Sequence, residues 1–398
     1  MPIALLALAV GAFAIGTTEF VAMGLLPEMA ATFGVSIPTA GWLVTAYALG
    51  VVVGAPTLTA LGHRFRRKHL LLALMVLFTA GHVATALAPT FGLLVAARAV
   101  SALAHGAFFG ASAVVARRLA PPGREGLAMA LGFTGLTVAN VVGVPLGTAL
   151  GQQVGWRTTY AVVAGIGLLT IAALALLVPD VDASGGTLRT ELAAFRSAQV
   201  WLTLGLTVVG FSGLFTVLSY VAPIATGLAG YAPASVSWLL VLFGLGATAG
   251  NLAGGRLADW SVPRTLVLGL LAQAAVFALF ALAGGSRAAT AAAVFGFGFA
   301  GFAMTTSIQT RAIVAAGGGA GMVAAAQQAA FNTGNALGAY LGGLVLDLGL
   351  GYRSPMVVAA VLTLAGLGVL GVSLRAERTG RAPLEPVQLP RAGRVTTR

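Results

Sequence analysis

Long apolar runs, separated by short polar or basic connections, occupy almost the whole chain. Each run has roughly 20 residues, the length of an α-helix that crosses the hydrocarbon core of a bilayer. Twelve such segments are expected, near 3–28, 39–61, 70–88, 91–116, 126–150, 157–178, 200–227, 234–257, 264–284, 289–314, 321–348 and 353–375. Because the connections are short, neighbouring segments should run antiparallel. The pattern predicts an all-α integral membrane protein.

The composition excludes a soluble protein of this size. Only 8% of the 398 residues are charged and 58% are hydrophobic, which leaves too little charge to cover a water-exposed surface. Cysteine is absent, so disulfides and thiolate metal sites are excluded. The four histidines, at 63, 69, 82 and 105, show no metal-ligand spacing. We therefore expect neither a metal nor a cofactor.

The basic residues indicate how the chain is oriented. Eighteen of the 22 Lys and Arg residues fall in connections and a tail that would share one side of the membrane, and three fall on the other side. The positive-inside rule then places both termini in the cytoplasm. Topology thus accounts for the net charge of +12, and nucleic acid is set aside as a partner. The low Lys content and the high Ala, Gly and Arg content favour a high-GC bacterium. We expect the protein in the cytoplasmic (inner) membrane of that bacterium.

Motifs recur at an offset of 195 or 196 residues, close to half the chain length. Position 27 matches 223, 59–63 matches 255–259, 140–147 matches 335–342, and 155–157 matches 351–353. A six-helix unit repeated in the same orientation predicts two bundles related by an axis along the membrane normal. The expected organisation is a bundle over 1–178, a cytoplasmic linker over 179–199, a second bundle over 200–375, and a basic, disordered cytoplasmic tail over 376–398.

Glu19, Arg98 and His105 are the candidates for proton coupling inside the predicted spans, whereas His82 in the third segment is expected to be structural. Glu19 occupies the first segment, and Arg98 and His105 the fourth. At about 1.5 Å per residue, Glu19 and Arg98 come out at similar depth, where a pair of charges is less costly than a lone one. Alternatively, Arg98 binds backbone carbonyls of a neighbouring helix and only stabilises the fold. His105 either relays protons, lines a cavity, or bonds to a neighbouring helix.

Several stretches resemble a known family of transporters. They read GTTEFVAMGLLP at 16–27, YALGVVVGAP at 47–56, HGAFFG at 105–110, TVANVVGVPLG at 137–147 and GWR at 155–157. Together they resemble the major facilitator superfamily, specifically twelve-helix drug–proton antiporters such as bacterial arabinose-efflux, sugar-efflux and chloramphenicol-resistance permeases. The resemblance implies a monomer with the major facilitator fold that binds its small-molecule substrate between the two bundles.

The resemblance also nominates gating residues. In the loop after the second segment, Arg64, Arg67 and Lys68 match the family motif, but Thr59, His63 and Arg66 replace its two glycines and its aspartate. The second copy keeps Gly255 and Asp259. The alternative is that these basic residues only set topology. In the fifth segment, Gly143, Pro145 and Gly147 resemble the antiporter motif, although small residues every fourth position also permit close helix packing.

Polar and aromatic residues inside the spans are candidates to bind the substrate. The set comprises Tyr47, Phe108, Asn140, Tyr220, Gln309, Gln328, Asn332 and Asn335. The last three recur at spacings of four and three and so share one helical face. For each amide the alternative is a structural hydrogen bond between helices.

Our mechanistic hypothesis is that Glu19 carries protons and drives efflux of a drug, sugar or nucleoside by antiport. An ATP-driven pump is excluded within this chain, because its one lysine, Lys68, lies in no phosphate-binding loop. An intramembrane hydrolase would need a nucleophile elbow, which is missing, so we expect a secondary transporter and no enzyme. An uncoupled facilitator or a proton-coupled uptake symporter is the main alternative.

Overall fold

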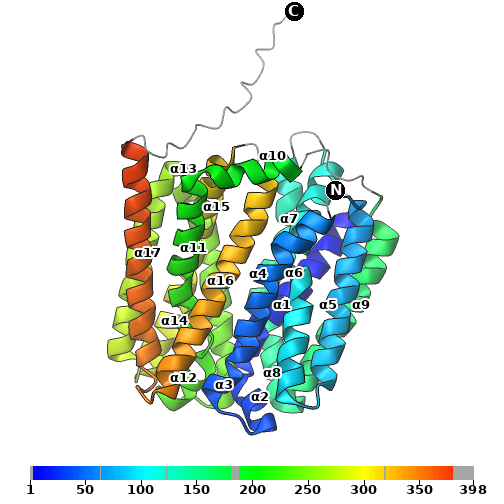
Figure 1. The fold of residues 1–398 in the computed structure, drawn as a ribbon. Helices are drawn as coiled ribbons and strands as arrows, with labels where there is room; N and C mark the ends of the chain where they lie inside the picture. Colours follow the sequence, from blue (N-terminus) through cyan, green and yellow to red (C-terminus); the bar gives the residue numbers. More distant parts are fainter. Residues whose placement is uncertain (1–2, 63, 122–123, 181–187, 318–319, 380–398) are drawn as a thin grey trace, which may run out of the picture.

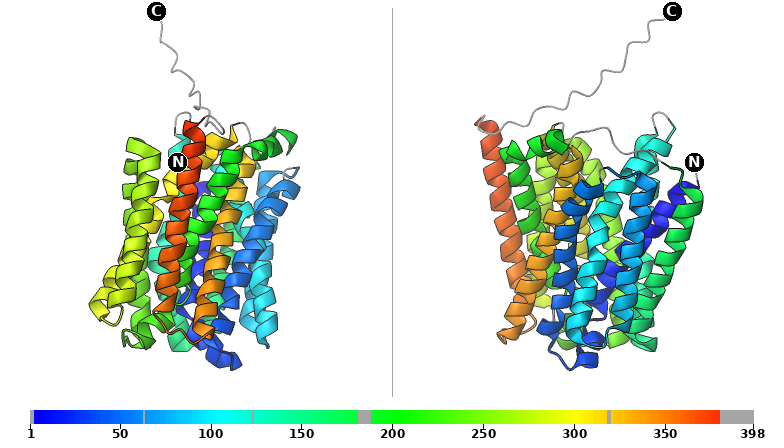
Figure 2. Two further views of the ribbon diagram at one scale, coloured as in Figure 1. Left: turned by 60° about the vertical axis from the view of Figure 1, so that its left-hand side comes forward. Right: turned by 45° about the vertical axis from the view of Figure 1, so that its right-hand side comes forward.

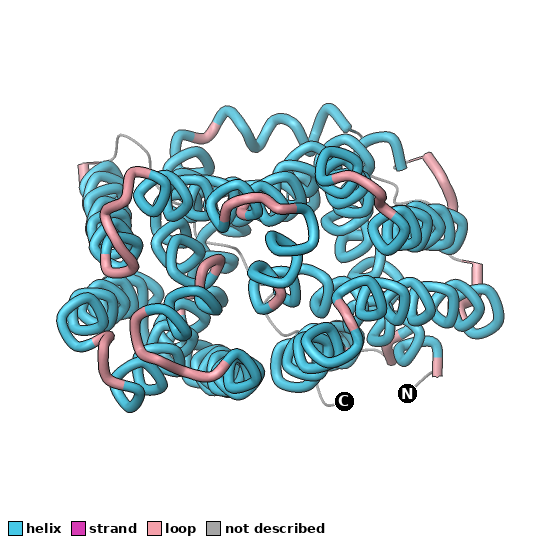
Figure 3. The backbone as a smooth tube through the Cα atoms, turned by 90° about the horizontal axis from the view of Figure 1, so that it is seen from below, coloured by secondary structure: helices cyan, strands magenta, loops and turns pink. Residues whose placement is uncertain are grey.

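The computed structural model describes residues 3–62, 64–121, 124–180, 188–317 and 320–379. Within these ranges the chain forms helices and no strands (Figures 1 and 3). His63, residues 181–187 of the linker and residues 380–398 of the predicted disordered tail lie outside the described residues.

The helices before the linker, called here the first half, occupy one side of the molecule in Figure 1, and those after it, the second half, occupy the other. The first half comprises α1 (Ala4–Gly24), α2 (Leu26–Phe33), α3 (Ile37–Ala40), α4 (Trp42–Gly62), α5 (Arg67–Leu87), α6 (Phe91–Leu119), α7 (Glu125–Val138), the π-helix η1 (Ala139–Gly143), α8 (Val144–Val154) and α9 (Trp156–Leu177). The linker contains α10 (Leu188–Ala193) and the 3-10 turn η2 (Ala194–Arg196). The second half comprises α11 (Ala198–Leu218), α12 (Val221–Gly227), η3 (Pro233–Ser235), α13 (Val236–Ala283), α14 (Arg287–Ala303), α15 (Thr305–Ala316), α16 (Ala320–Asp347) and α17 (Ser354–Arg378).

The twelve segments predicted from hydropathy are all helical. Ten helices of the described residues are long and apolar enough to cross a membrane. One of them, α13, holds two predicted segments, because the backbone leaves helical geometry at Ser261, two residues before Pro263. The 28-residue helix α16 corresponds to a further predicted segment. The start of α1, the end of α17 and α10 lie at one end of the bundle, which we call the terminus side; α2, α3 and α12 lie at the opposite end, the far side (Figures 1 and 2).

The internal repeat is reflected in glycines at matching positions, where two helices of each half pack closely. A Cβ atom built on Gly54 of α4 would lie 2.2 Å from the carbonyl oxygen of Leu103 in α6. At an offset of 196 residues, a Cβ atom on Gly250 of α13 would lie 2.1 Å from the carbonyl oxygen of Phe299 in α14. In both halves, therefore, the absence of a side chain lets the two backbones touch.

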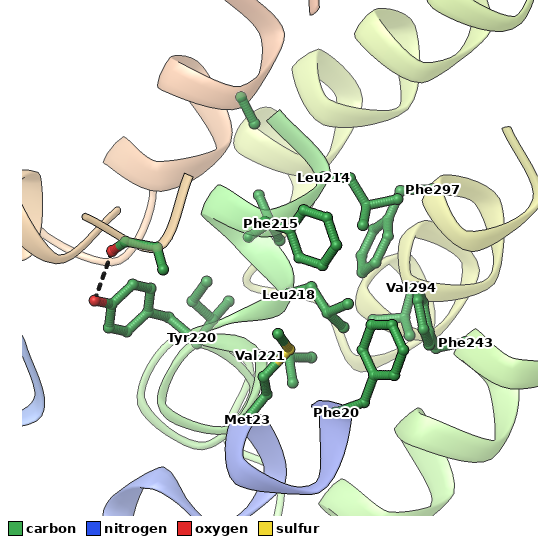
Figure 4. Packing of buried hydrophobic residues seen from close by; sticks show 14 of the residues in the cluster. Phe20, Met23, Leu214, Phe215, Leu218, Tyr220, Val221, Phe243, Val294 and Phe297 are labelled. Atoms are coloured by element: carbon green, nitrogen blue, oxygen red, sulfur yellow. Dashed lines mark hydrogen bonds between the residues drawn. The ribbon is translucent and has the colours of Figure 1, made fainter. Parts of the chain in front are cut away.

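Aromatic and aliphatic side chains from both halves meet on the far side of the molecule. Phe20 and Met23 of α1 pack among buried residues of α11 to α14 (Figure 4). The Phe20 ring stacks on Phe215 with centroids 6.4 Å apart and lies 6.1 Å from the Phe243 ring. We call these residues, with Leu218 and Val221, the far-side cluster. Gln152 adds a polar contact there by donating to the carbonyl of Pro233, at 3.1 Å, across the two halves.

Glu28, on α2 outside the spanning helices, supplies a pH-dependent test of the far side. Burial raises the pKa of this carboxyl above its usual value, and hydrogen bonds from its own backbone and from Gln152 only partly oppose the shift. The ionised form is therefore disfavoured in the folded protein, and stability is lost as pH rises through the raised pKa. We expect Glu28→Gln to raise the melting temperature slightly at pH 7, on the order of 1–2 °C, and to leave it unchanged at pH 4. Thermal unfolding followed by intrinsic fluorescence checks this; an equal rise at both pH values would contradict it.

Candidate functional site: a cavity between the two halves

A cavity of about 200 Å³ lies between the halves and is lined by helices of both. Its lining residues are Glu19, Phe20, His105, Phe109, Phe133, Leu136, Asn140, Thr207, Phe211, Phe302, Thr305, Ile308, Gln309, Gln327, Gln328 and Phe331. A second cavity, of about 230 Å³, shares Phe109, Phe133 and the three glutamines. It reaches the ends of α6 and α15 and the beginning of α16, which lie on the terminus side.

Glu19 projects from α1 into this cavity and is 4% exposed. Its Oε1 atom has no hydrogen-bond partner among the described residues. Its Oε2 atom lies 4.0 Å from Nε2 of His105. A carboxyl at this depth with an unoccupied oxygen has capacity for a proton or for a hydrogen-bond donor of a ligand.

His105, on α6, is fixed at both ring nitrogens. Its Nδ1 lies 3.2 Å from the hydroxyl of Tyr47 on α4, and its Nε2 lies 3.1 Å from the amide nitrogen of Gln328 on α16. With the Gln328 amide oriented to donate, Nε2 accepts and the ring carries its proton on Nδ1. His105 thus bonds to a neighbouring helix and also lines the cavity, two of the three alternatives that the sequence left open.

Arg98 lies behind Tyr47 and is fully buried. Its guanidinium carbon is 4.3 Å from the centroid of the Tyr47 ring and 5.5 Å from that of Tyr160, both within cation–π range. Its Nη1 atom donates to the Thr18 carbonyl at 3.2 Å and to the Thr18 hydroxyl at 3.0 Å. That hydroxyl also lies 2.6 Å from Nε2 of His82, whose Nδ1 lies 2.7 Å from the Phe78 carbonyl.

The sequence led us to expect that Glu19 and Arg98 would form a pair. The structure places both beside Tyr47, but no oxygen of Glu19 lies within 4.0 Å of an Arg98 nitrogen. Instead, aromatic faces and a backbone carbonyl surround the guanidinium. The contact with the Thr18 carbonyl corresponds to the alternative that Arg98 binds a backbone carbonyl of a neighbouring helix. Thr18 is the residue directly before Glu19 in α1. Arg98 therefore fixes the turn of α1 that presents Glu19.

Some of the predicted binding residues reach the cavity and others do not. Asn140, Gln309 and Gln328 line it, and Tyr47 supports His105 from behind. Phe108 does not line it: its ring packs against Gly11 in the core of the first half, and Phe109, one residue on, faces the cavity. A step of one residue turns a helix by about 100°, so sequence alone does not decide between adjacent phenylalanines.

Tyr220, Asn332 and Asn335 also lie outside the cavity lining. Tyr220 directly precedes α12 on the far side and donates to the Ala339 carbonyl at 2.9 Å (Figure 4). Asn332 is buried on α16 and donates to the Gln328 carbonyl at 3.1 Å. Asn335, also buried, has no side-chain hydrogen-bond partner among the described residues. Their shared helical face therefore extends beyond the cavity.

Sequence reasoning missed most of the apolar lining. Six phenylalanines surround the cavity: Phe20, Phe109, Phe133, Phe211, Phe302 and Phe331. Phenylalanine inside a span gives no signal, because lipid-facing and cavity-facing rings look alike in sequence. Thr18, adjacent to Glu19, and Thr207, which accepts from Gln327 at 2.6 Å, were also missed. A polar side chain next to the one acid of its span was a usable signal for Thr18.

Three of the predicted gating residues, Arg64, Arg67 and Asp259, lie on the terminus side, near the connection after α4 and the kink of α13. Arg64 and Asp259 are exposed, whereas Arg67 is buried and donates to the Gly62 carbonyl at 3.4 Å. Arg66, which replaces a residue of the family motif, forms an ion pair with Asp180 after α9. The loop after α4 is thus tied to the end of α9 within the first half.

Gly143 ends a π-helical turn, and Pro145 and Gly147 follow it. The π-helix η1 (Ala139–Gly143) interrupts the helix formed by α7 and α8 directly before Pro145, and π-helical turns are frequent at functional sites. A Cβ atom on Gly143 would lie 2.2 Å from the Thr17 hydroxyl, and one on Gly147 3.0 Å from Val21, so both glycines allow α1 to approach closely. The turn also carries Asn140, whose backbone carbonyl faces Gly244 of the second half.

Comparison with known proteins agrees with this architecture. The family model described as Major Facilitator Superfamily matches residues 8–317 and 221–396. The chain is 41% identical over 376 residues to the inner membrane transport protein YdhP of Escherichia coli (strain K12), covering 94% of this chain and 96% of that protein. It is 38% identical over 373 residues to the putative transporter AraJ of the same strain, covering 92% and 93%. It is 33% identical over 390 residues to a chloramphenicol resistance protein of Streptomyces lividans, covering 97% and 99%.

Solved structures share the fold at low sequence identity. A D-xylose-proton symporter matches with a TM-score of 0.77 at 17% identity and covers 92% of this chain and 96% of its own. A bacterial homologue of the human lysosomal transporter Spinster, in an inward-facing and unoccupied conformation, matches with a TM-score of 0.77 at 18% identity and covers 94% and 97%. The chain therefore belongs to the major facilitator superfamily of membrane transporters.

Proposed function

We propose that the protein exports a small organic solute across the bacterial cytoplasmic membrane in exchange for protons. The observation that carries this proposal is Glu19, a buried carboxyl that lines the cavity and, within the described part of the chain, has no hydrogen-bond partner at Oε1 and no Lys or Arg nitrogen within 4.0 Å. Such a group can hold either a proton or a substrate donor, which is the exclusive occupancy that antiport requires. Arg98 and His105 position Glu19 for this exchange.

The positions of the cavities support alternating access. The far-side cluster packs residues of both halves together at one end, while the second cavity extends the site toward the terminus side. With both termini in the cytoplasm, as the distribution of basic residues favours, this arrangement is an inward-facing state. The two halves would then move relative to each other about the site, connected by the linker over 179–199.

The lining favours a solute that combines an apolar ring with hydrogen-bond donors. Thr207 donates its hydroxyl proton to the Thr203 carbonyl at 2.9 Å, so it must accept from the Gln327 amide nitrogen, and the Gln327 oxygen is left without a donor. Oxygens of Glu19 and Asn140 are also unpaired. With six phenyl rings around them, these acceptors fit an amphenicol-like compound better than a free sugar.

An uncoupled facilitator or an uptake symporter is the second candidate. A single carboxyl does not set the direction of transport. The names of the relatives do not settle the substrate either, since one is a chloramphenicol resistance protein and another a probable sugar efflux transporter. The free carboxyl oxygen favours coupled transport of either direction over an uncoupled facilitator, because a facilitator has no need of an ionisable group at this depth.

Substrate-evoked proton movement in proteoliposomes tests the proposal. Vesicles with an internal pH dye are challenged with amphenicols, sugars and nucleosides in turn. We expect an amphenicol to release protons into the compartment from which it is taken up, since the solute displaces the proton from Glu19. Solute flux without proton movement would establish a facilitator, and co-directional proton flux would establish a symporter.

A further inference from the structure

One hydrogen bond joins the two halves at the level of Glu19. Gln328, on α16 of the second half, donates its amide to Nε2 of His105, on α6 of the first half, at 3.1 Å. The second half offers no acid or base to match Glu19 and Arg98, because the residues at the repeat offset of 196 are Phe215 and Val294. If the second half responds to a proton bound in the first, it must do so through a neutral side chain that touches the site.

The Nε2 lone pair of His105 has two competing donors. Gln328 occupies it now, while Oε2 of Glu19 lies 4.0 Å away. Ionised Glu19 has no proton to donate, so the lone pair stays with Gln328. Protonated Glu19 is a hydroxyl donor and, after a small rotation, a stronger one than a neutral amide. The single lone pair of Nε2 cannot accept from Gln328 and from protonated Glu19 at the same time.

The surroundings of His105 leave few other titratable groups to account for. Among the described residues, α1 presents Glu19 and α4 presents Tyr47, with Arg98 behind the Tyr47 ring. On α6 itself the ring of Phe109 packs 5.3 Å away, and α16 presents only the amide of Gln328. The competition for Nε2 therefore involves Glu19 and Gln328.

We propose that Gln328 is the positioning residue through which the second half responds to the proton on Glu19. When Glu19 is ionised, Gln328 donates to His105 and ties α16 to α6. When Glu19 is protonated, its hydroxyl donates to Nε2 and the amide of Gln328 is released, with the proton remaining on the carboxyl. The inference rests on the proposed function, because it assumes that Glu19 exchanges protons during transport.

Interhalf distances measured against pH test this inference without a substrate. The chain has no cysteine, so spin labels can be placed at Arg118→Cys and Arg256→Cys, two exposed positions of the terminus side in opposite halves. Thr333 is the control, since it lies on the same helix outside the cavity lining and donates to the Ala329 carbonyl of its own helix at 2.8 Å. We expect the distance distribution to change with pH in the otherwise unaltered protein and in Thr333→Val, and to be independent of pH in Gln328→Leu.

Gln328→Asn, one methylene too short to reach Nε2, gives a second variant should the leucine protein fail to fold, and it should lose the response likewise. A wild-type pH response in folded Gln328→Leu or Gln328→Asn overturns the inference. A protein that moves protons in the proteoliposome assay but shows no pH-dependent distance change overturns it too and leaves the proposed function standing. If the unaltered protein moves no protons, both the proposed antiport and the role of Gln328 are wrong.

Discussion

Glu19→Gln is expected to reduce substrate-evoked proton movement to the level of empty liposomes while the protein stays folded. Glutamine has nearly the same shape as glutamate, so it preserves packing against His105, but it can neither bind nor release a proton. Substrate counterflow, which exchanges solute for solute without a proton gradient, should persist. Parallel recordings of proton and solute flux from one preparation make the comparison.

A matched carboxylate is available as the control for Glu19. Glu28 is partly buried on α2 and lies outside the cavity lining, so Glu28→Gln removes a carboxyl of the same chemistry without touching the site. Coupled flux should survive in that variant. If Glu19→Gln kept full proton coupling, the carrier would have to be another group, and Glu19 would become a binding or packing residue.

Gly54→Val is expected to cause the largest loss of folded protein of any change considered. The new Cβ atom would lie 2.2 Å from the Leu103 carbonyl oxygen and 2.5 Å from the Leu103 Cα atom, and backbone atoms cannot turn away as a side-chain tip can. Helices α4 and α6 would have to separate, which costs more than the roughly 1–3 kcal/mol of ordinary overpacking. Size-exclusion chromatography of detergent extracts should show the monodisperse peak almost abolished.

The repeat supplies both a replicate and a control for this variant. Gly250→Val should cause a comparable loss, since a Cβ atom there meets the Phe299 carbonyl oxygen at 2.1 Å. Gly165→Val, in α9, should leave the peak nearly unchanged, because a Cβ atom at that position meets no atom within 4 Å. A normal peak for Gly54→Val would show that α4 and α6 can separate without loss of the fold.

Hydropathy and the repeat predicted the fold almost completely, because a span must be apolar over its whole length regardless of its neighbours. Side-chain partners were predicted less well. Depth along the helix brought Glu19 and Arg98 to one level but did not reveal that the guanidinium packs over the Tyr47 ring and that the nearest basic nitrogen to the carboxyl is Nε2 of His105, at 4.0 Å. Depth says nothing about the rotation of a helix about its axis, and that rotation decided between Phe108 and Phe109.

Tyr220 shows a second limit of the sequence. An aromatic residue with a hydroxyl inside a span is equally suited to hold a ligand or to fill an interface. The deciding feature is a pair of glycines far away in sequence: Cβ atoms on Gly41 and Gly343 would lie 2.0 and 2.4 Å from the Tyr220 hydroxyl. Only the folded chain brings these two positions to the same side chain.

Glu19 and Phe20 are consecutive residues of α1 that both line the cavity, and the Phe20 ring also stacks on Phe215 in the far-side cluster. If Glu19 carries the proton as proposed, a single peptide unit links the proton site to the packing between the two halves. A roll of α1 that moves the carboxyl to a new environment would then also unstack the ring, so the two motions would share one coordinate and one activation barrier.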